Sequence, residues 1–124
     1  MTTDKMELKF GRVRIFQNIL IAELNEGVLF TSEDNQELLA IGKEVFKDRA
    51  YGYISLRQNS YAVDPMVYRE SARAQNLKAI AVVSENELIR LNAHKVERQF
   101  YKAPNSFEVF DNLDQAINWI KYKI

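Results

Sequence analysis

The chain has no cysteine, one histidine, two prolines and a formal net charge of zero. Without cysteine it can form no disulfide and has no thiol nucleophile or thiolate metal ligand. A zinc site would need mostly carboxylate ligands, because His94 is the single histidine, and such sites are uncommon. The sequence therefore predicts no metal, no cofactor and no catalytic residue of these kinds.

The balance of charge argues against a polyanionic partner, because 17 Lys and Arg balance 17 Asp and Glu. Binding to nucleic acid or to an acidic membrane depends on concentrated positive charge, so we expect neither. Aliphatic runs such as Ile19–Ala22 and Ala79–Val83 fall far short of the roughly 20 residues of a membrane helix. The first residues, MTTDKMELK, contain no apolar signal-peptide core. We therefore expect a cytoplasmic protein without a membrane span.

The rest of the chain is organised around Leu77–Ser84, LKAIAVVS. This run is apolar on both faces of an extended segment, which is typical of a parallel strand covered on both sides. Ser84 and Glu87 have the spacing of a capping box, so the sequence predicts a helix directly after the strand. A strand followed at once by a helix is half of a βαβ unit.

Local signals predict the remaining elements. Residues 1–6 are expected to be a flexible tail, and residues 7–124 a single domain. The fold class is α/β, in the order β-β-α-β-α-β-α-β-α, with a mostly parallel five-stranded sheet and an antiparallel first strand. The predicted strands are Glu7–Phe16 with a bulge at Gly11, Ile19–Leu24, Tyr51–Leu56, Leu77–Val83 and Ser106–Phe110. The predicted helices are Ser32–Lys47, Pro65–Gln75, Glu85–Phe100 and a last helix that Asn112 caps.

Function in an open α/β sheet concentrates outside the carboxyl ends of the strands. The loop from Arg57 to Asp64 has the most hydrogen-bonding groups there, and Asp64-Pro65 has the pattern of a helix start. Free amides at a helix start attract anions, and an arginine can hold a phosphate or carboxylate with two bonds. The competing interpretation, which we favour, is that these groups tie down their own loop. The candidate ligand- or partner-binding residues are Arg57, Asn59, Ser60, Tyr61 and Asp64.

Four segments resemble those of a known family: the opening hairpin, Ile54–Tyr68 (ISLRQNSYAVDPMVY), Lys78–Ser84, and the AxxWI pattern at Ala116–Ile120. Over essentially the whole chain, they resemble the STAS domain, the SpoIIAA-like fold of bacterial anti-sigma-factor antagonists, which is related in fold to CRAL-TRIO lipid-transfer domains. The resemblance implies regulation by protein–protein contact. Signalling members carry a phosphorylated serine in an Asp-x-Ser-Gly motif. That motif is missing here, so no phosphoacceptor is assigned.

These observations lead to three hypotheses. The first is a non-enzymatic regulatory or protein-interaction module of STAS-like type, with a protein partner. The second is a binding module for a small anionic or lipid-like ligand at the Arg57–Asp64 loop and the helix start that follows. The third is an enzyme that uses Ser60, Tyr61 or a carboxylate, which would require a base within hydrogen-bond reach of a nucleophile.

Overall fold

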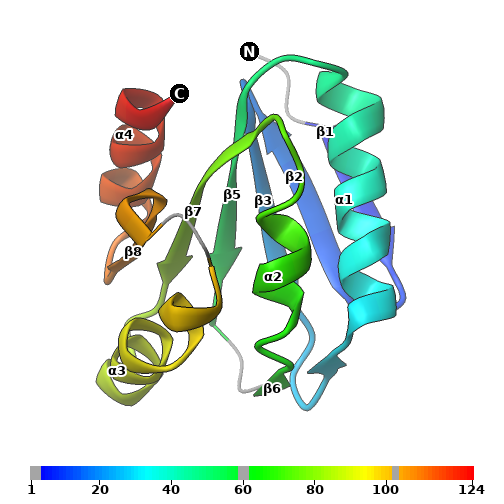
Figure 1. Ribbon diagram of the computed structural model, residues 1–124. Coiled ribbons are helices and arrows are strands. Elements are labelled where there is room, and N and C mark those ends of the chain that lie inside the picture. Colours follow the sequence, from blue (N-terminus) through cyan, green and yellow to red (C-terminus); the bar gives the residue numbers. More distant parts are fainter. Residues whose placement is uncertain (1–3, 59–61, 102–103) are drawn as a thin grey trace.

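The computed structural model describes residues 4–58, 62–101 and 104–124. It has an α/β fold with a six-stranded sheet in the order β1-β2-β3-β5-β7-β8 and a separate two-stranded sheet, β4-β6 (Figure 1). The strands are β1 Asp4–Leu8, β2 Gly11–Phe16, β3 Ile19–Leu24, β4 Leu29–Phe30, β5 Tyr51–Leu56, β6 Ala62–Val63, β7 Leu77–Val83 and β8 Phe107–Phe110. The helices are α1 Ser32–Phe46, α2 Val67–Ser71, α3 Glu87–Lys95 and α4 Leu113–Lys123, with 3-10 turns η1 Glu97–Phe100 and η2 Pro104–Ser106.

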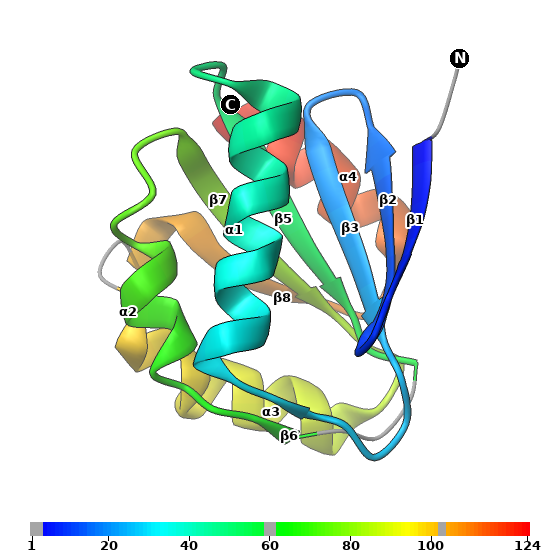
Figure 2. The same ribbon diagram turned by 90° about the vertical axis from the view of Figure 1, so that its right-hand side faces the viewer.

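The predicted central strand is confirmed as β7, an interior strand that runs parallel to β5 on one side and to β8 on the other. Ile80 and Val82 pack into the core that lies under α1 and α2. Ala79, Ala81 and Val83 pack into the second core, on the side of α4. Figure 2 shows α1 and α2 in front of the sheet and α4 behind it. The strand is apolar on both faces because both faces are covered.

The N-terminal part of the prediction is wrong in one respect. The segment Glu7–Phe16 is not one bulged strand, because β1 and β2 form an antiparallel hairpin that turns at residues 9–10. A turn produces the same slip in alternation as a bulge, since Phe10 swings into the core and lies edge-on to Phe30 at 5.6 Å. The sheet consequently has six strands, not five, and β1 takes in Asp4–Met6, which were expected to belong to the tail.

The parallel part of the sheet follows the prediction. The turn at Gln17-Asn18 joins β2 to β3 in an antiparallel hairpin, and β3, β5, β7 and β8 run parallel.

Thr31 caps α1 through a capping box with Asp34, and Asn112 caps α4 by accepting from the amide of Gln115 at 3.1 Å.

Two helices are shorter than predicted. Helix α2 spans Val67–Ser71 instead of Pro65–Gln75, because the chain on either side forms tight turns with bonds between residues three apart. Helix α3 begins at Glu87, not Glu85, because Asn86 is its cap and accepts from two amides at 2.9 and 3.2 Å. Ser84 instead ends the strand and is buried, and its hydroxyl accepts from the amide of Asn86.

Substitution of Gly52 tests the packing of α4 on the sheet. A Cβ at this position would come within 2.3 Å of Ile120 Cγ2, and Ile120 is fully buried. We expect Gly52→Ala to lower the free energy of unfolding by about 1–3 kcal/mol, because overpacking forces the helix to shift. Gln115→Ala, on the exposed side of α4, is the control and should change it by less than about 0.5 kcal/mol. Urea unfolding measures both, and an unchanged midpoint for Gly52→Ala would contradict this contact.

Candidate functional site

A cleft of about 680 Å³ lies at the carboxyl ends of β5, β7 and β8, where the topology predicts a site. Helices α3 and α4 both begin beside it. Sequence reasoning anticipated Arg57 but missed the loop after β8, because that strand was assigned no role at the rim. The residues that line the cleft are Leu56, Arg57, Gln58, Val83, Ser84, Glu85, Asn86, Ile89, Asp111, Asn112 and Leu113.

Arg57 is committed to an internal ion pair. Its Nη1 and Nη2 donate to the two carboxylate oxygens of Glu97 at 2.7 and 2.5 Å, and the two side chains are only 6% and 5% exposed. Its Nε also donates to Ser55 Oγ at 3.1 Å, and Nη2 to the Tyr68 hydroxyl at 2.8 Å. The bidentate geometry that was expected to hold a ligand therefore holds Glu97.

Tyr68 completes the cluster, and its hydroxyl donates to the carboxylate of Glu97. Burial raises the pKa of Tyr68 well above its usual 10.0. Burial also tends to raise the pKa of Glu97, but the hydrogen bonds and charge of Arg57 outweigh it and hold that pKa below its usual 4.5. Tyr68 and Glu97 are within hydrogen-bond reach of each other, yet they are only 3% and 4% exposed. The cluster thus ties η1 to β5 and α2, and its three side chains are almost entirely buried.

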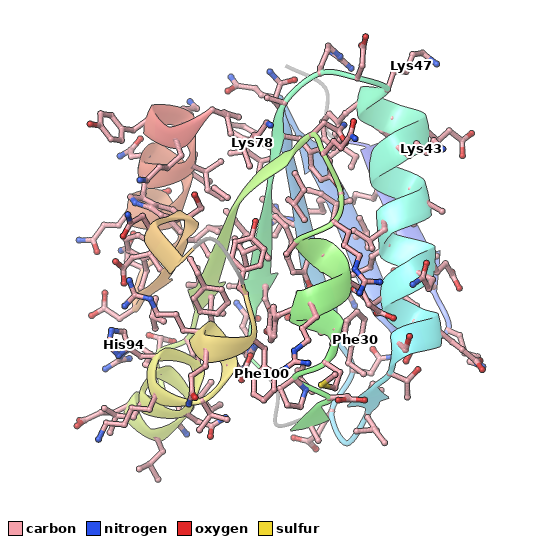
Figure 3. The ribbon with its side chains drawn as sticks, in the orientation of Figure 1. Phe30, Lys43, Lys47, Lys78, His94 and Phe100 are labelled. Atoms are coloured by element: carbon pink, nitrogen blue, oxygen red, sulfur yellow. The ribbon has the colours of Figure 1, made fainter. Side chains whose placement is uncertain are left out.

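Sequence reasoning assigned no role to Glu97. A signal was present, since Glu97 follows the buried Ala93 by four residues and therefore shares its face in the predicted helix Glu85–Phe100. A glutamate on a buried face requires a cation, but a single sequence does not identify Arg57, 40 residues away, as that partner. His94 is exposed, with Nε2 2.9 Å from Arg98 Nη1 (Figure 3).

The other predicted site residues are not gathered around the cleft. Asp64 accepts from the amide of Met66 at 3.0 Å and begins the turn before α2. It does not line the cleft, to judge from the described part of the chain. Asn59, Ser60 and Tyr61 lie outside the described residues. Within those residues, no group of three or more His, Asp or Glu side chains could hold a metal ion.

The cleft is unfavourable for an anion. Glu85 and Asp111 line it, and the charge of Arg57 is neutralised by Glu97. The two carboxylates repel a phosphate or carboxylate ligand, and Arg90, whose Nη1 donates to the carbonyl of Ser84 at 2.8 Å, lies at the same rim. The cleft is better suited to a neutral ligand, whose apolar part could contact Leu56, Val83 and Leu113.

Large apolar side chains are exposed at the same end of the molecule. Leu88 is 75% and Leu91 is 42% exposed on α3, which buries only Ala93. Leu29 on β4 and Met66 before α2 are also exposed, by 59% and 45%. Figures 1 and 2 both show α3 and the small β4-β6 sheet beyond the carboxyl ends of the central strands. This end therefore presents apolar surface to solvent.

Comparisons of the chain with protein-family models, with curated proteins and with solved structures return no match. Among the described residues, no helix combines the length and apolarity needed to cross a bilayer.

Replacement of Glu97 tests the role assigned to the ion pair. Glu97→Gln leaves the Arg57 guanidinium buried without a counter-charge, so we expect it to lower the free energy of unfolding by about 3–5 kcal/mol at neutral pH. The folded-state pKa of Glu97 is depressed, so its contribution is full above 4.5 and is lost as the pH falls through the folded-state value. The difference between wild type and variant should therefore shrink in acid.

Urea unfolding at neutral and acidic pH measures this difference. Glu44→Gln, on the exposed side of α1, is the matched control and should behave like wild type at both. A destabilisation by Glu97→Gln that is equally large in acid would contradict an ionic origin.

Proposed function

We propose that the chain is a non-enzymatic protein-interaction module of STAS-like type that binds its partner through the outer face of α3. One observation carries the proposal: Leu88 and Leu91 are exposed by 75% and 42% on the same helix. Leucines three residues apart share one face of a helix. Burial of such a side chain contributes about 1.5–3 kcal/mol, so a partner that covers both gains substantial free energy.

The residues around the two leucines define the partner's chemistry. Lys95 lies on the same face as Leu88 and Leu91, seven and four residues after them, and Glu87 lies beside Leu91 at the start of the helix. The helix therefore presents an apolar strip with an acid at one end and a base at the other. A complementary protein surface has an apolar groove with a basic group to meet Glu87 and a carboxylate to meet Lys95.

The buried cluster supports an interaction role for this end. Arg57, Tyr68 and Glu97 join the end of β5 to α2 and to η1, the turn that directly follows α3. A binding surface on rigid elements loses less conformational entropy on association. The resemblance to STAS domains points the same way, since it implies regulation by protein contact, here without the family's phosphorylated serine.

A small ligand at the Arg57–Asp64 end is the second candidate, and the cleft of about 680 Å³ favours it. The charges that line the cleft favour the lipid-like form of this hypothesis over the anionic form. Apolar atoms of Leu56, Val83, Ile89 and Leu113 would contact such a ligand.

Site-specific photocrosslinking tests the interaction proposal. A photoreactive benzoyl-phenylalanine at position 88, in cells that naturally make the protein, should give a discrete adduct upon irradiation. The same group at Tyr122, which is 84% exposed on α4, is the matched control and should give none. Leu91→Glu in the position-88 chain should reduce the adduct by about tenfold or more, because it removes apolar contact from the strip.

Circular dichroism of the Leu91→Glu chain should match wild type, so that lost crosslinking reflects the surface and not the fold. An adduct at twice the chain's mass would identify the partner as a second copy. Three results would each refute the proposal: no adduct from position 88, equal adduct yields from positions 88 and 122, or an adduct yield that Leu91→Glu does not change.

A further inference from the structure

A second hollow, of about 760 Å³, lies at the other end of the sheet, where β5 and β7 begin. One wall is the carboxyl-terminal half of α1 and the other is the chain from Ala74 to Lys78. Figure 3 shows Lys43 and Lys47 on α1 and Lys78 near the start of β7, all toward the end of the molecule opposite α3. The lysine groove, as we call it, is lined by Gln36, Leu39, Ala40, Lys43, Lys47, Asp48, Ala50, Tyr51, Ala74, Gln75, Asn76 and Lys78.

The groove carries uncompensated positive charge. Lys43, Lys47 and Lys78 are exposed, and within residues 4–58, 62–101 and 104–124 none of them forms an ion pair. Asp48 is the one carboxylate among the described lining residues. Three cations against one anion create a positive potential inside a concave surface, where low-dielectric walls concentrate it.

Stabilisation of the helix does not account for this arrangement. Lysines near the end of α1 interact favourably with the helix dipole. However, Lys43 and Lys47 both line the groove, where their like charges repel each other. Lys78 belongs to a strand and gains nothing from that dipole. The charges instead share the groove that they border.

Lys47 also occupies an unfavourable backbone conformation. Its φ is 57° and its ψ is −112° at the position that ends α1, where glycine is the residue that adopts positive φ without steric cost. A residue other than glycine that is held in such a backbone conformation is a reason to consider a functional role. At this position the residue is Lys47, whose ammonium group lines the groove.

The floor and far wall of the groove are apolar and rigid. Tyr51 is buried and stacks on Phe46 with ring centroids 4.6 Å apart, and Leu39 and Ala74 contribute further apolar atoms. The side-chain amide of Asn76 donates to the carbonyls of Lys47 and Arg49 at 2.9 and 3.0 Å, which joins the two walls. The groove thus combines an apolar contact surface with the three lysines that line it.

We propose that the lysine groove binds a phosphate monoester with a small apolar body. The ammonium groups of Lys43, Lys47 and Lys78 hold the phosphate, and the floor around Leu39 and Tyr51 contacts the organic part. The site is separate from the α3 surface, since it lies at the opposite end of the sheet. Loss of one activity therefore leaves the other intact.

Calorimetric titration of the full chain with phenyl phosphate tests the proposal. We expect saturable binding, and a loss of affinity of about tenfold or more in the double variant Lys43→Gln/Lys47→Gln, because two charge-assisted contacts are removed. The matched control is Lys9→Gln/Lys121→Gln, which removes the same charge from exposed positions in the β1-β2 turn and on α4 and should bind like wild type.

Three further ligands define the chemistry. Phenol should not bind, and inorganic phosphate should bind more weakly than phenyl phosphate. Vesicles of phosphatidylcholine with phosphatidic acid distinguish a lipid headgroup from a soluble ester, and binding to them with the same lysine dependence would assign the phosphate to a lipid. Failure of phenyl phosphate and these vesicles to bind, equal losses in the two double variants, or inorganic phosphate binding as tightly as the ester would overturn the proposal.

Discussion

The fold depends on the burial of β7 and β5 between two apolar layers. A strand that is apolar on both faces is stable only if both faces are covered, which places α1 and α2 on one side and α4 on the other. The loops that link these helices and strands therefore lie at the two ends of the sheet. Because the covered faces exclude polar groups, polar side chains are concentrated in these loops, and the two ends carry different sets of them.

The two ends differ in how they handle charge. At the carboxyl end, the guanidinium of Arg57 is inside the protein, and a buried charge is tolerated only when it is paired. Glu97 and Tyr68 satisfy it, so its charge is not offered to a ligand in the cleft. At the amino end, Lys43 and Lys47 keep their charges in water at the mouth of a groove. A buried pair stabilises the protein, whereas only exposed, unpaired charges are free to attract a ligand.

Local patterns predicted much of the fold, and long-range pairings account for what they missed. Tyr51–Leu56 and Leu77–Val83 were predicted with the observed bounds, because a short run rich in aromatic or aliphatic residues between polar segments is distinctive. The β1-β2 turn was mistaken for a bulge, since both shift the alternation by one residue. The location of a cleft at the carboxyl rim followed from topology, but Asp111–Leu113 were missed there.

The internal ion pair of Arg57 has a physical cause that applies to any strand-end arginine. Its position in the sequence is compatible both with a ligand-binding role and with an internal ion pair, and exposure decides between them. At 7% exposure the cost of desolvation requires a carboxylate nearby, and Glu97, at the start of η1, is the residue whose own burial requires a cation. Each of the two residues accounts for the burial of the other. An unexplained buried acid in a sequence is therefore a reason to look for an arginine, before that arginine is assigned to a ligand.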